Sequence, residues 1–222
     1  MTHIVILSGG MDSATLLYAV RREHPNALMA AISFDYGQRH KKEIDSARTL
    51  AVQVGAVFRM VPMGVMHDSA LVDRKVEVPE GRYDDASMRS TVVQGRNLLF
   101  ASVATALSEP GDDIYLGVHA GDHAIYPDCR EEFWWHLTNA IRSAYGVDIH
   151  TPFIASTKAD IAKLGSDLGV PYGMTWSCYK GGPMHCGRCG TCVERAEAFS
   201  RAGVIDPTTY EDPFYWREAV GV

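Results

Sequence analysis

Short apolar runs alternate with longer amphipathic segments along most of this sequence, and the alternation limits the folds that the chain can adopt. The runs of strand length lie at residues 4–7, 28–34, 57–61 and 114–118. The segments with helical periodicity lie at residues 13–22, 41–54, 97–107, 130–145 and 156–169. Because strands that alternate with helices need crossover connections, we predict an α/β fold with one parallel sheet covered by helices on both faces.

The connection over residues 63–90 breaks this rhythm. It contains Pro79, Gly81 and a mixture of charges. Connections of this length without regular structure are usually functional lids or mobile loops. The sequence leaves both alternatives open.

Length and charge narrow the class of protein. The 222 residues, 46% of them apolar, suffice for one globular domain with a small appendage. A net charge of −6 argues against a chain that binds nucleic acid by neutralising many phosphates. The amino terminus has no secretory pattern, and no run approaches the roughly 20 apolar residues of a spanning helix. We expect a soluble, cytoplasmic protein that binds neither membrane nor nucleic acid directly.

The hexapeptide SGGMDS, residues 8–13, follows the first apolar run and opens the first predicted helix. Backbone N–H groups at a helix start attract anions, and Gly9 and Gly10 let the chain approach an oxygen closely. The pattern lacks the Lys-Ser/Thr ending of a Walker loop and the third glycine of a dinucleotide fingerprint. The alternative is a plain strand-to-helix turn with Asp12 or Ser13 as the N-cap.

The hexapeptide resembles the S-G-G-x-D-S loop of the ATP pyrophosphatase family, whose members transfer AMP to an oxygen and release diphosphate. The resemblance implies that Ser8, Gly9, Gly10 and Ser13 hold phosphates and that Asp12 assists Mg²⁺ or the loop geometry. The ATP-binding segment that it implies comprises Leu7, Ser8, Gly9, Gly10, Met11, Asp12, Ser13, Ala14, Thr15, Leu16 and Leu17.

The same resemblance places a lysine on a later helix near the departing phosphates. Lys158, in the stretch TKADIA, stands where that lysine is expected. The alternative for Lys158 is a solvated helix residue beside Asp160. As catalytic residues the resemblance implies Asp12, Lys158 and Arg96.

Four of the five cysteines crowd into the stretch CYKGGPMHCGRCGTC, at Cys178, Cys186, Cys189 and Cys192. Four thiolates at such short spacing suit a tetrahedral, structural Zn²⁺. Two disulfides are disfavoured because pairs so close in sequence are strained and the chain looks cytosolic. An iron–sulfur cluster fits less well, since no fourth cysteine followed by proline closes the run. His185, inside the segment, is expected at the surface.

Longer segments resemble the signature stretches of the 7-cyano-7-deazaguanine synthase family. They are FDYGQRHKKEIDSA (34–47), GRNLLFASVA (95–104), YPDCREEF (126–133) and TWSCYKGGPMHCGRCGTC (175–192). The resemblance implies a Rossmann-like fold of the adenine nucleotide alpha hydrolase type over residues 1–173 and a zinc-binding segment over 174–222. It also suggests a homodimer.

The implied reaction converts 7-carboxy-7-deazaguanine and ammonia to the nitrile, with ATP and Mg²⁺, in a pathway to deazaguanine-modified nucleosides of the queuosine type. Adenylation turns the carboxylate into an electrophile that ammonia attacks. A second activation removes the amide oxygen. By residue type and resemblance, the substrate-binding candidates are Asp35, Tyr36, Gln38, Arg96, Asn97, Asp122, Asp128 and Arg130. For Asp128 the alternative is a cap on the helix over residues 130–145.

Two departures from the family pattern leave the product open. Gln94 replaces the proline that usually precedes Gly-Arg-Asn, and HAGDHAI, with Asp122 and His123, stands before YPDCR. The product is then a nitrile, an amide or a protein conjugate. A tRNA-thiolation enzyme is a further alternative, but it needs reactive thiols and only Cys129 lies outside the cluster. A zinc-binding module with a decayed nucleotide fold conflicts with the intact loop.

Overall fold

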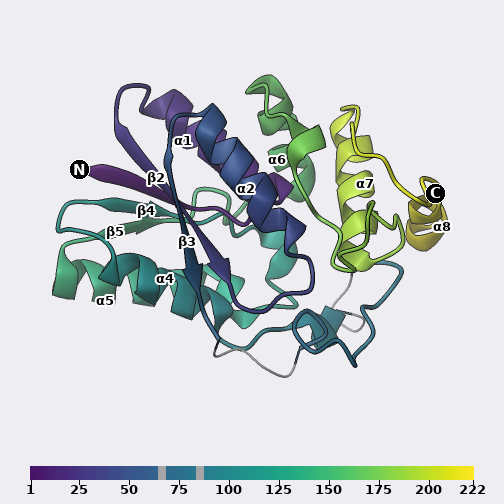
Figure 1. The fold of residues 1–222 in the computed structure, drawn as a ribbon, viewed down its shortest axis with the longest axis horizontal. Helices are drawn as coiled ribbons and strands as arrows, with labels where there is room; N and C mark the ends of the chain where they lie inside the picture. The colour runs from purple at the N-terminus through teal and green to yellow at the C-terminus, as the bar shows by residue number, and fades with distance from the viewer. Residues whose placement is uncertain (65–68, 84–87) are drawn as a thin grey trace.

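The computed structural model describes residues 1–64, 69–83 and 88–222, and its centre is a five-stranded sheet (Figure 1). The strand order is β3-β2-β1-β4-β5, and every neighbouring pair is parallel. The strands are β1 (Thr2–Ile6), β2 (Leu28–Asp35), β3 (Val57–Pro62), β4 (Asp113–Tyr115) and β5 (Asp148–His150). This order is that of the doubly wound, Rossmann-like folds, so the predicted fold class is confirmed.

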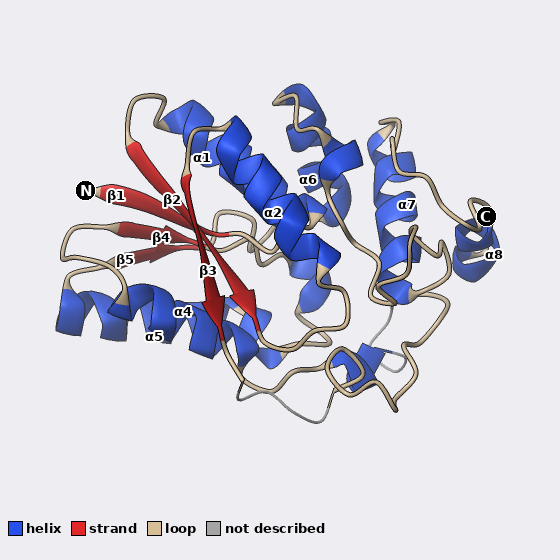
Figure 2. Cartoon of the chain, viewed as in Figure 1, coloured by secondary structure: helices blue, strands red, loops and turns tan. Residues whose placement is uncertain are grey.

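Helices cover both faces of the sheet, as predicted. Figure 2 shows α1, α2 and α6 on one face and α4 and α5 on the other. The helices in chain order are α1 (Met11–Glu23), α2 (Lys42–Gln53), α4 (Arg96–Ala106), α5 (Glu131–Tyr145), α6 (Lys158–Asp167), α7 (Gly190–Ala202) and α8 (Tyr215–Val220). Among the residues described, none of these helices is long and apolar enough to cross a membrane.

The first strand shows why the sheet is buried on both sides. Successive side chains of a strand point to opposite faces. Ile4 and Ile6 accordingly pack in the core beneath α4 and α5, whereas Val5 and Leu7 pack in the core beneath α1 and α2. A run of four apolar residues is therefore required, because neither face of the central strand meets water.

The sequence did not predict β5, α7 or α8. In β5 only Ile149 is buried, between Asp148 and His150, so no apolar run marks the strand. Helix α7 begins inside the cysteine cluster, where glycines and cysteines mask its periodicity. It packs on α6, and Phe199 of α7 lies in the same core as Leu16 of α1. The division at residue 173 remains a prediction.

The irregular connection over residues 63–90 is described only in part, since residues 65–68 and 84–87 lie outside the described residues. Its described part approaches the cysteine cluster: Glu80 forms an antiparallel bridge with Cys189, and Gly81 N–H donates to the carbonyl of Arg188 at 2.9 Å.

Candidate active site and metal centre

A pocket lies at the carboxyl ends of β1, β2 and β4, where the strand order reverses between β1 and β4. In doubly wound sheets this reversal leaves a crevice in which ligands bind. The lining comes from the hexapeptide, α2, α4, α6 and the segment that carries the cysteines. It includes Ser8, Gly10, Met11, Asp12, Ser13, Tyr36, His40, Glu43, Tyr83, Arg96, Asn97, Phe100, Asp122, Cys129, Lys158, Ser177, Tyr179 and Thr191.

Gly9 shapes the turn between β1 and α1, and only glycine fits there. Its φ is +93°, and a Cβ at this position would lie 2.0 Å from the carbonyl oxygen of Glu43. The carbonyl of Gly9 accepts a hydrogen bond from the N–H of Trp176 at 2.9 Å. The loop is thus clamped between α2 and the cysteine-bearing segment.

The hydroxyl of Ser13 organises the inside of the loop. It accepts from the N–H groups of Ser8 and Gly9 at 3.2 and 3.3 Å and lies 2.9 Å from the hydroxyl of Ser8. The N-cap of α1 is Gly10, without a side-chain cap, so the alternative with Asp12 or Ser13 as N-cap is wrong. The first turn of α1 therefore faces the pocket with N–H groups that have no acceptor within the helix, which suits an anion.

Asp12 and Lys158 meet in the pocket, beside the first turn of α1. Lys158 Nζ lies 3.3 Å from Asp12 Oδ2 and 2.6 Å from Glu194 Oε2. Burial disfavours the charge on Lys158, but the carboxylates of Asp12, Glu194 and Asp122 outweigh burial and raise its pKa. The Lys158 side chain is only 14% exposed, so the alternative of a solvated helix residue is wrong.

The second carboxylate oxygen of Asp12 is poised for a ligand. Asp12 Oδ1 is buried and has no hydrogen-bond partner among the described residues. His119 completes the surroundings: Gly121 N–H donates to its Nδ1 at 3.1 Å, so Nε2 carries the proton in the neutral ring. That nitrogen lies 3.5 Å from Asp122 and 3.9 Å from Asp12. A carboxylate oxygen without a partner beside phosphate-binding groups is a suitable ligand for Mg²⁺.

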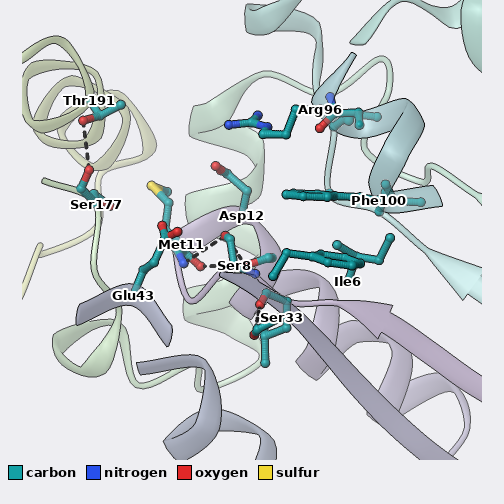
Figure 3. A pocket seen from close by; sticks show the side chains of 18 of the residues that line it. Ile6, Ser8, Met11, Asp12, Ser33, Glu43, Arg96, Phe100, Ser177 and Thr191 are labelled. Atoms are coloured by element: carbon teal, nitrogen blue, oxygen red, sulfur yellow. Dashed lines mark hydrogen bonds between the residues drawn. The ribbon is translucent and has the colours of Figure 1, made fainter. Parts of the chain in front are cut away.

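The opposite wall of the pocket is aromatic and carries Arg96. Phe34 and Phe100 stack with their ring centroids 4.1 Å apart, and Tyr36 leans on Phe100. Figure 3 shows Arg96 and Asp12 reaching into the same open part of the pocket, with Phe100 alongside. A flat apolar wall beside a guanidinium can hold an aromatic ring that bears a carboxylate.

The predicted substrate residues divide into two groups. Four of them line the pocket: Tyr36, Arg96, Asn97 and Asp122. The other four, Asp35, Gln38, Asp128 and Arg130, are not among the lining residues. Asp35 pairs with Lys41 at 2.8 Å, and the exposed Arg130 donates to the carbonyl of His123. Asp128 accepts from the N–H of Asn97 at 3.0 Å and so caps α4 instead of α5.

The predicted ATP segment divides in the same way. Leu7, Ser8 and residues 10–13 line the pocket. Gly9 does not line it and packs against the carbonyl of Glu43. The remaining four residues, Ala14, Thr15, Leu16 and Leu17, are buried on α1. Leu16 and Leu17 pack in the core, and Thr15 lies 2.7 Å from the hydroxyl of Tyr172.

Gln38, the last of the predicted substrate residues, is fully buried and orients Glu43. Its Oε1 accepts from the N–H of Tyr36, so its Nε2 must face acceptors, and it donates to the Phe34 carbonyl and to Glu43 Oε1 at 2.9 Å. Glu43 Oε2 lies 3.4 Å from His40 Nε2. Burial raises the pKa of Glu43 to about 8 and lowers that of His40 to about 3. At neutral pH this contact therefore joins two uncharged groups.

Replacing Glu43 by glutamine is expected to remove a pH dependence of stability. The folded pKa of about 8 exceeds the unfolded value near 4.5, so wild type loses stability as pH rises from about 5 to 8. The free energy of unfolding of Glu43→Gln, relative to that of wild type, should rise by about 3 kcal/mol across that interval. Urea unfolding at pH 5, 7 and 9 measures it. Glu23→Gln, on the exposed side of α1, is the control, and an advantage that does not change with pH would contradict the expectation.

The four cysteines form a second, separate centre. The Sγ atoms of Cys178, Cys186, Cys189 and Cys192 lie within 4.8 Å of one another, all four residues are buried, and none forms a disulfide. The Cys186 sulfur accepts from the N–H groups of Arg188 and Cys189 at 3.4 and 3.2 Å, as thiolate ligands commonly do. The predicted metal-binding cluster is thus assembled, and the disulfide alternative is wrong.

His185 is not a surface residue, contrary to expectation. It is 6% exposed, packs on Trp176 and Tyr210, and its Nε2 accepts from the N–H of Ser177. The segment folds back on itself to close the cluster, which carries His185 inside. His185 thus supports the irregular segment around Trp176 that contacts Gly9.

Glu43, His119, Tyr83, Tyr179 and Glu194 line or border the site and were not predicted from the sequence. Glu43 and Glu194 lie on helices whose polar residues are expected to face solvent. The one available signal for Glu194 was its position two residues after Cys192. A charged residue so close to a buried ligand has little room to reach water.

Comparisons with known proteins agree with the geometry. The family model described as "Queuosine biosynthesis protein QueC" matches residues 2–203. A 7-cyano-7-deazaguanine synthase from Agrobacterium fabrum is 46% identical, with 97% of this chain and 94% of that protein covered. One from Ruegeria sp. is 44% identical, with 99% and 97% covered. The solved structure of a U34-tRNA thiolase, NcsA from Methanococcus maripaludis, is 13% identical and has a TM-score of 0.47. The match covers 100% of this chain and 82% of the thiolase, and so distant a likeness supports no inference about function.

Proposed function

Because the chain belongs to the QueC family, we propose that it is a ligase that converts 7-carboxy-7-deazaguanine and ammonia to 7-cyano-7-deazaguanine with ATP. The observation that carries the proposal is the position of Asp12 and Lys158 beneath the glycine loop, at the carboxyl ends of the central strands. The relatives that match over nearly the whole chain bear the name of this synthase.

The chemistry needs positioning more than a nucleophilic side chain. The substrate carboxylate attacks the α-phosphorus of ATP, diphosphate leaves, and the acyl-adenylate forms. Ammonia then displaces AMP and gives the amide. The amide oxygen attacks a second ATP, and loss of AMP with the amide protons gives the nitrile. Each step concentrates negative charge on phosphates, which preorganised cations and N–H groups stabilise.

The residues of the pocket supply these groups. The free N–H groups of the first turn of α1 and the hydroxyls of Ser8 and Ser13 bind phosphate oxygens, and Lys158 stabilises the departing diphosphate. Asp12 would hold Mg²⁺ through its unpartnered Oδ1. Arg96 holds the substrate carboxylate beside the α-phosphorus.

We propose zinc as the metal of the four-cysteine cluster. Tetrahedral Zn–S bonds of about 2.3 Å place sulfurs about 3.8 Å apart, and the Cys186 and Cys192 sulfurs lie 4.0 Å apart. With four protein ligands the ion has no open position, so it stabilises the fold of residues 174–222 and takes no part in the reaction. The ion takes the place of the apolar core that so short a segment cannot build by itself.

Incubation with ATP, Mg²⁺, ammonia and 7-carboxy-7-deazaguanine is expected to release AMP and diphosphate and to give the nitrile. Mass spectrometry of the products, with ammonia present or withheld, separates the nitrile from the amide and from a protein conjugate. Omitting 7-carboxy-7-deazaguanine is the control. Formation of ADP and phosphate alone would refute adenylation.

The amide and the protein conjugate are the alternative products, since Asp122 and His123 occupy the stretch where the family pattern differs. Thiolation of tRNA has less support, because Cys129 is the one thiol outside the cluster and burial raises its pKa far above the usual range. The homodimer and the cytoplasmic location remain predictions. Light scattering after size-exclusion chromatography measures the first.

A further inference from the structure

Glu194 connects the metal-binding segment to the active site. It lies on α7 two residues after Cys192, and its Oε2 lies 2.6 Å from Lys158 Nζ. Its other oxygen, Oε1, lies close to Gly121, in the turn between His119 and Asp122. Both side chains of the pair are largely buried, with 12% and 14% exposed. The contact is therefore shielded from solvent, unlike a surface ion pair.

The next residue, Arg195, locks α7 in the register that this contact requires. Its guanidinium is fully buried and donates to the carbonyl of Tyr172 at 3.0 Å, to Thr175 Oγ1 at 2.6 Å and to Ser177 Oγ at 3.2 Å. Asp206 neutralises its charge at 3.1 Å. The segment that Arg195 grips also donates to Gly9, through the N–H of Trp176. The position of α7 is thus tied to the glycine loop from two sides.

A lysine with only one carboxylate nearby would form a close ion pair with that carboxylate. Lys158 is held between two carboxylates on different elements, 3.3 Å from Asp12 and 2.6 Å from Glu194, so its ammonium group is kept between α1 and α7. This position leaves the ammonium group facing the phosphate site that the loop forms. Since a buried ammonium group needs compensation, the second carboxylate also offsets the cost of burying it.

We infer that Glu194 is a positioning residue that acts through Lys158, so that the helix nucleated at the cysteine cluster completes the active site. The inference rests on the proposed function for the role of Lys158. It gives the metal-binding segment a task beyond stabilising the carboxyl-terminal fold. The metal itself stays outside the reaction.

The test is Glu194→Gln, which keeps the size of the side chain and removes its charge. We expect kcat to fall about tenfold while the KM for ATP does not rise, because the loop N–H groups that bind ATP are untouched. The metal content should equal that of wild type. The matched control is Glu197→Gln, on the same helix, whose carboxylate pairs with the exposed Arg201. Its kcat and KM should stay within twofold of wild type.

A double-mutant cycle with Lys158→Met separates positioning from a general loss of structure. If Glu194 acts through Lys158, adding Glu194→Gln to Lys158→Met should cause no further loss of kcat. The double variant should also unfold at a higher temperature than Lys158→Met, in which Glu194 remains as an unpaired buried carboxylate. Glu194→Asp, which withdraws the charge by one methylene, is the second variant if Glu194→Gln does not fold, and it should also lower kcat.

Three results would overturn the inference. They are an unchanged kcat in Glu194→Gln, losses that add fully in the double variant, and loss of the metal from Glu194→Gln, which would make Glu194 a support of the cysteine cluster. The proposed function fails separately, if wild type itself releases no AMP and diphosphate.

Discussion

Replacing Asp12 by asparagine should lower the rate of AMP formation about 100-fold or more and leave the protein folded. The substitution keeps the shape of the side chain but removes the charge that faces Lys158 at 3.3 Å and the unpartnered oxygen assigned to Mg²⁺. Groups that stabilise developing charge in a water-poor site commonly contribute a factor of this size. Steady-state release of diphosphate measures the rate, and circular dichroism confirms the fold.

The control for Asp12→Asn is Asp45→Asn, which removes a carboxylate from the exposed side of α2. It should retain the wild-type rate. If Asp12→Asn kept more than a tenth of the wild-type rate, Asp12 would have no place in the mechanism. Raising the Mg²⁺ concentration should restore part of the lost rate if the missing charge is a metal ligand.

Replacing Cys189 by serine should remove the metal and lower the unfolding temperature by about 10 °C or more. Cys189 is completely buried, and its loss leaves three thiolates around an ion that needs four ligands. Because metal binding is coupled to folding, losing it costs several kcal/mol, and each kcal/mol moves the midpoint of a chain of this length by about 2–4 °C. Elemental analysis should find about one zinc per wild-type chain and much less in the variant.

The control for Cys189→Ser is Cys129→Ser, which changes the one cysteine outside the cluster. The Cys129→Ser protein should have the zinc content of wild type and nearly the same unfolding temperature. Iron in place of zinc in wild type would refute the proposed metal, and a Cys189→Ser protein that kept full metal content would refute the ligand set.

The four-cysteine cluster and the pocket are physically joined through α7. Helix α7 starts at the cluster, carries Glu194 to Lys158, and through Arg195 fixes the segment that binds the carbonyl of Gly9. A disturbance of the cluster should therefore reach the glycine loop within one helix turn. The loss of activity in Cys189→Ser should accordingly exceed what its loss of stability explains.

Features that depend on residues close together in the chain were predictable from the sequence. The apolar runs gave four of the five strands, and the glycine loop followed β1 as predicted. The spacing of the four cysteines predicted their cluster correctly, because ligands with only two to seven residues between them meet when the intervening glycines allow a tight turn. The three-residue strand β5 was not predicted, because its single buried residue, Ile149, forms no apolar pattern in the sequence.

The contents of the pocket depended on segments far apart in the chain. Gln38 was predicted to bind substrate, but it is fully buried and donates to Glu43, whose carboxyl group has a raised pKa. The alternative for Asp128 was a cap on α5, but it caps α4 at Asn97, 31 residues earlier. Its role in substrate binding stays a prediction.

The sequence by itself determined the α/β fold, the glycine loop after β1 and the four-cysteine cluster, since backbone geometry and ligand spacing are local properties. Only the tertiary structure decided which charges face one another. Lys158 and Glu194 are 36 residues apart, and each is an ordinary helix residue by local pattern. Their pairing arises because α6 packs on α7, and a packing contact between helices leaves no mark in the spacing of either one.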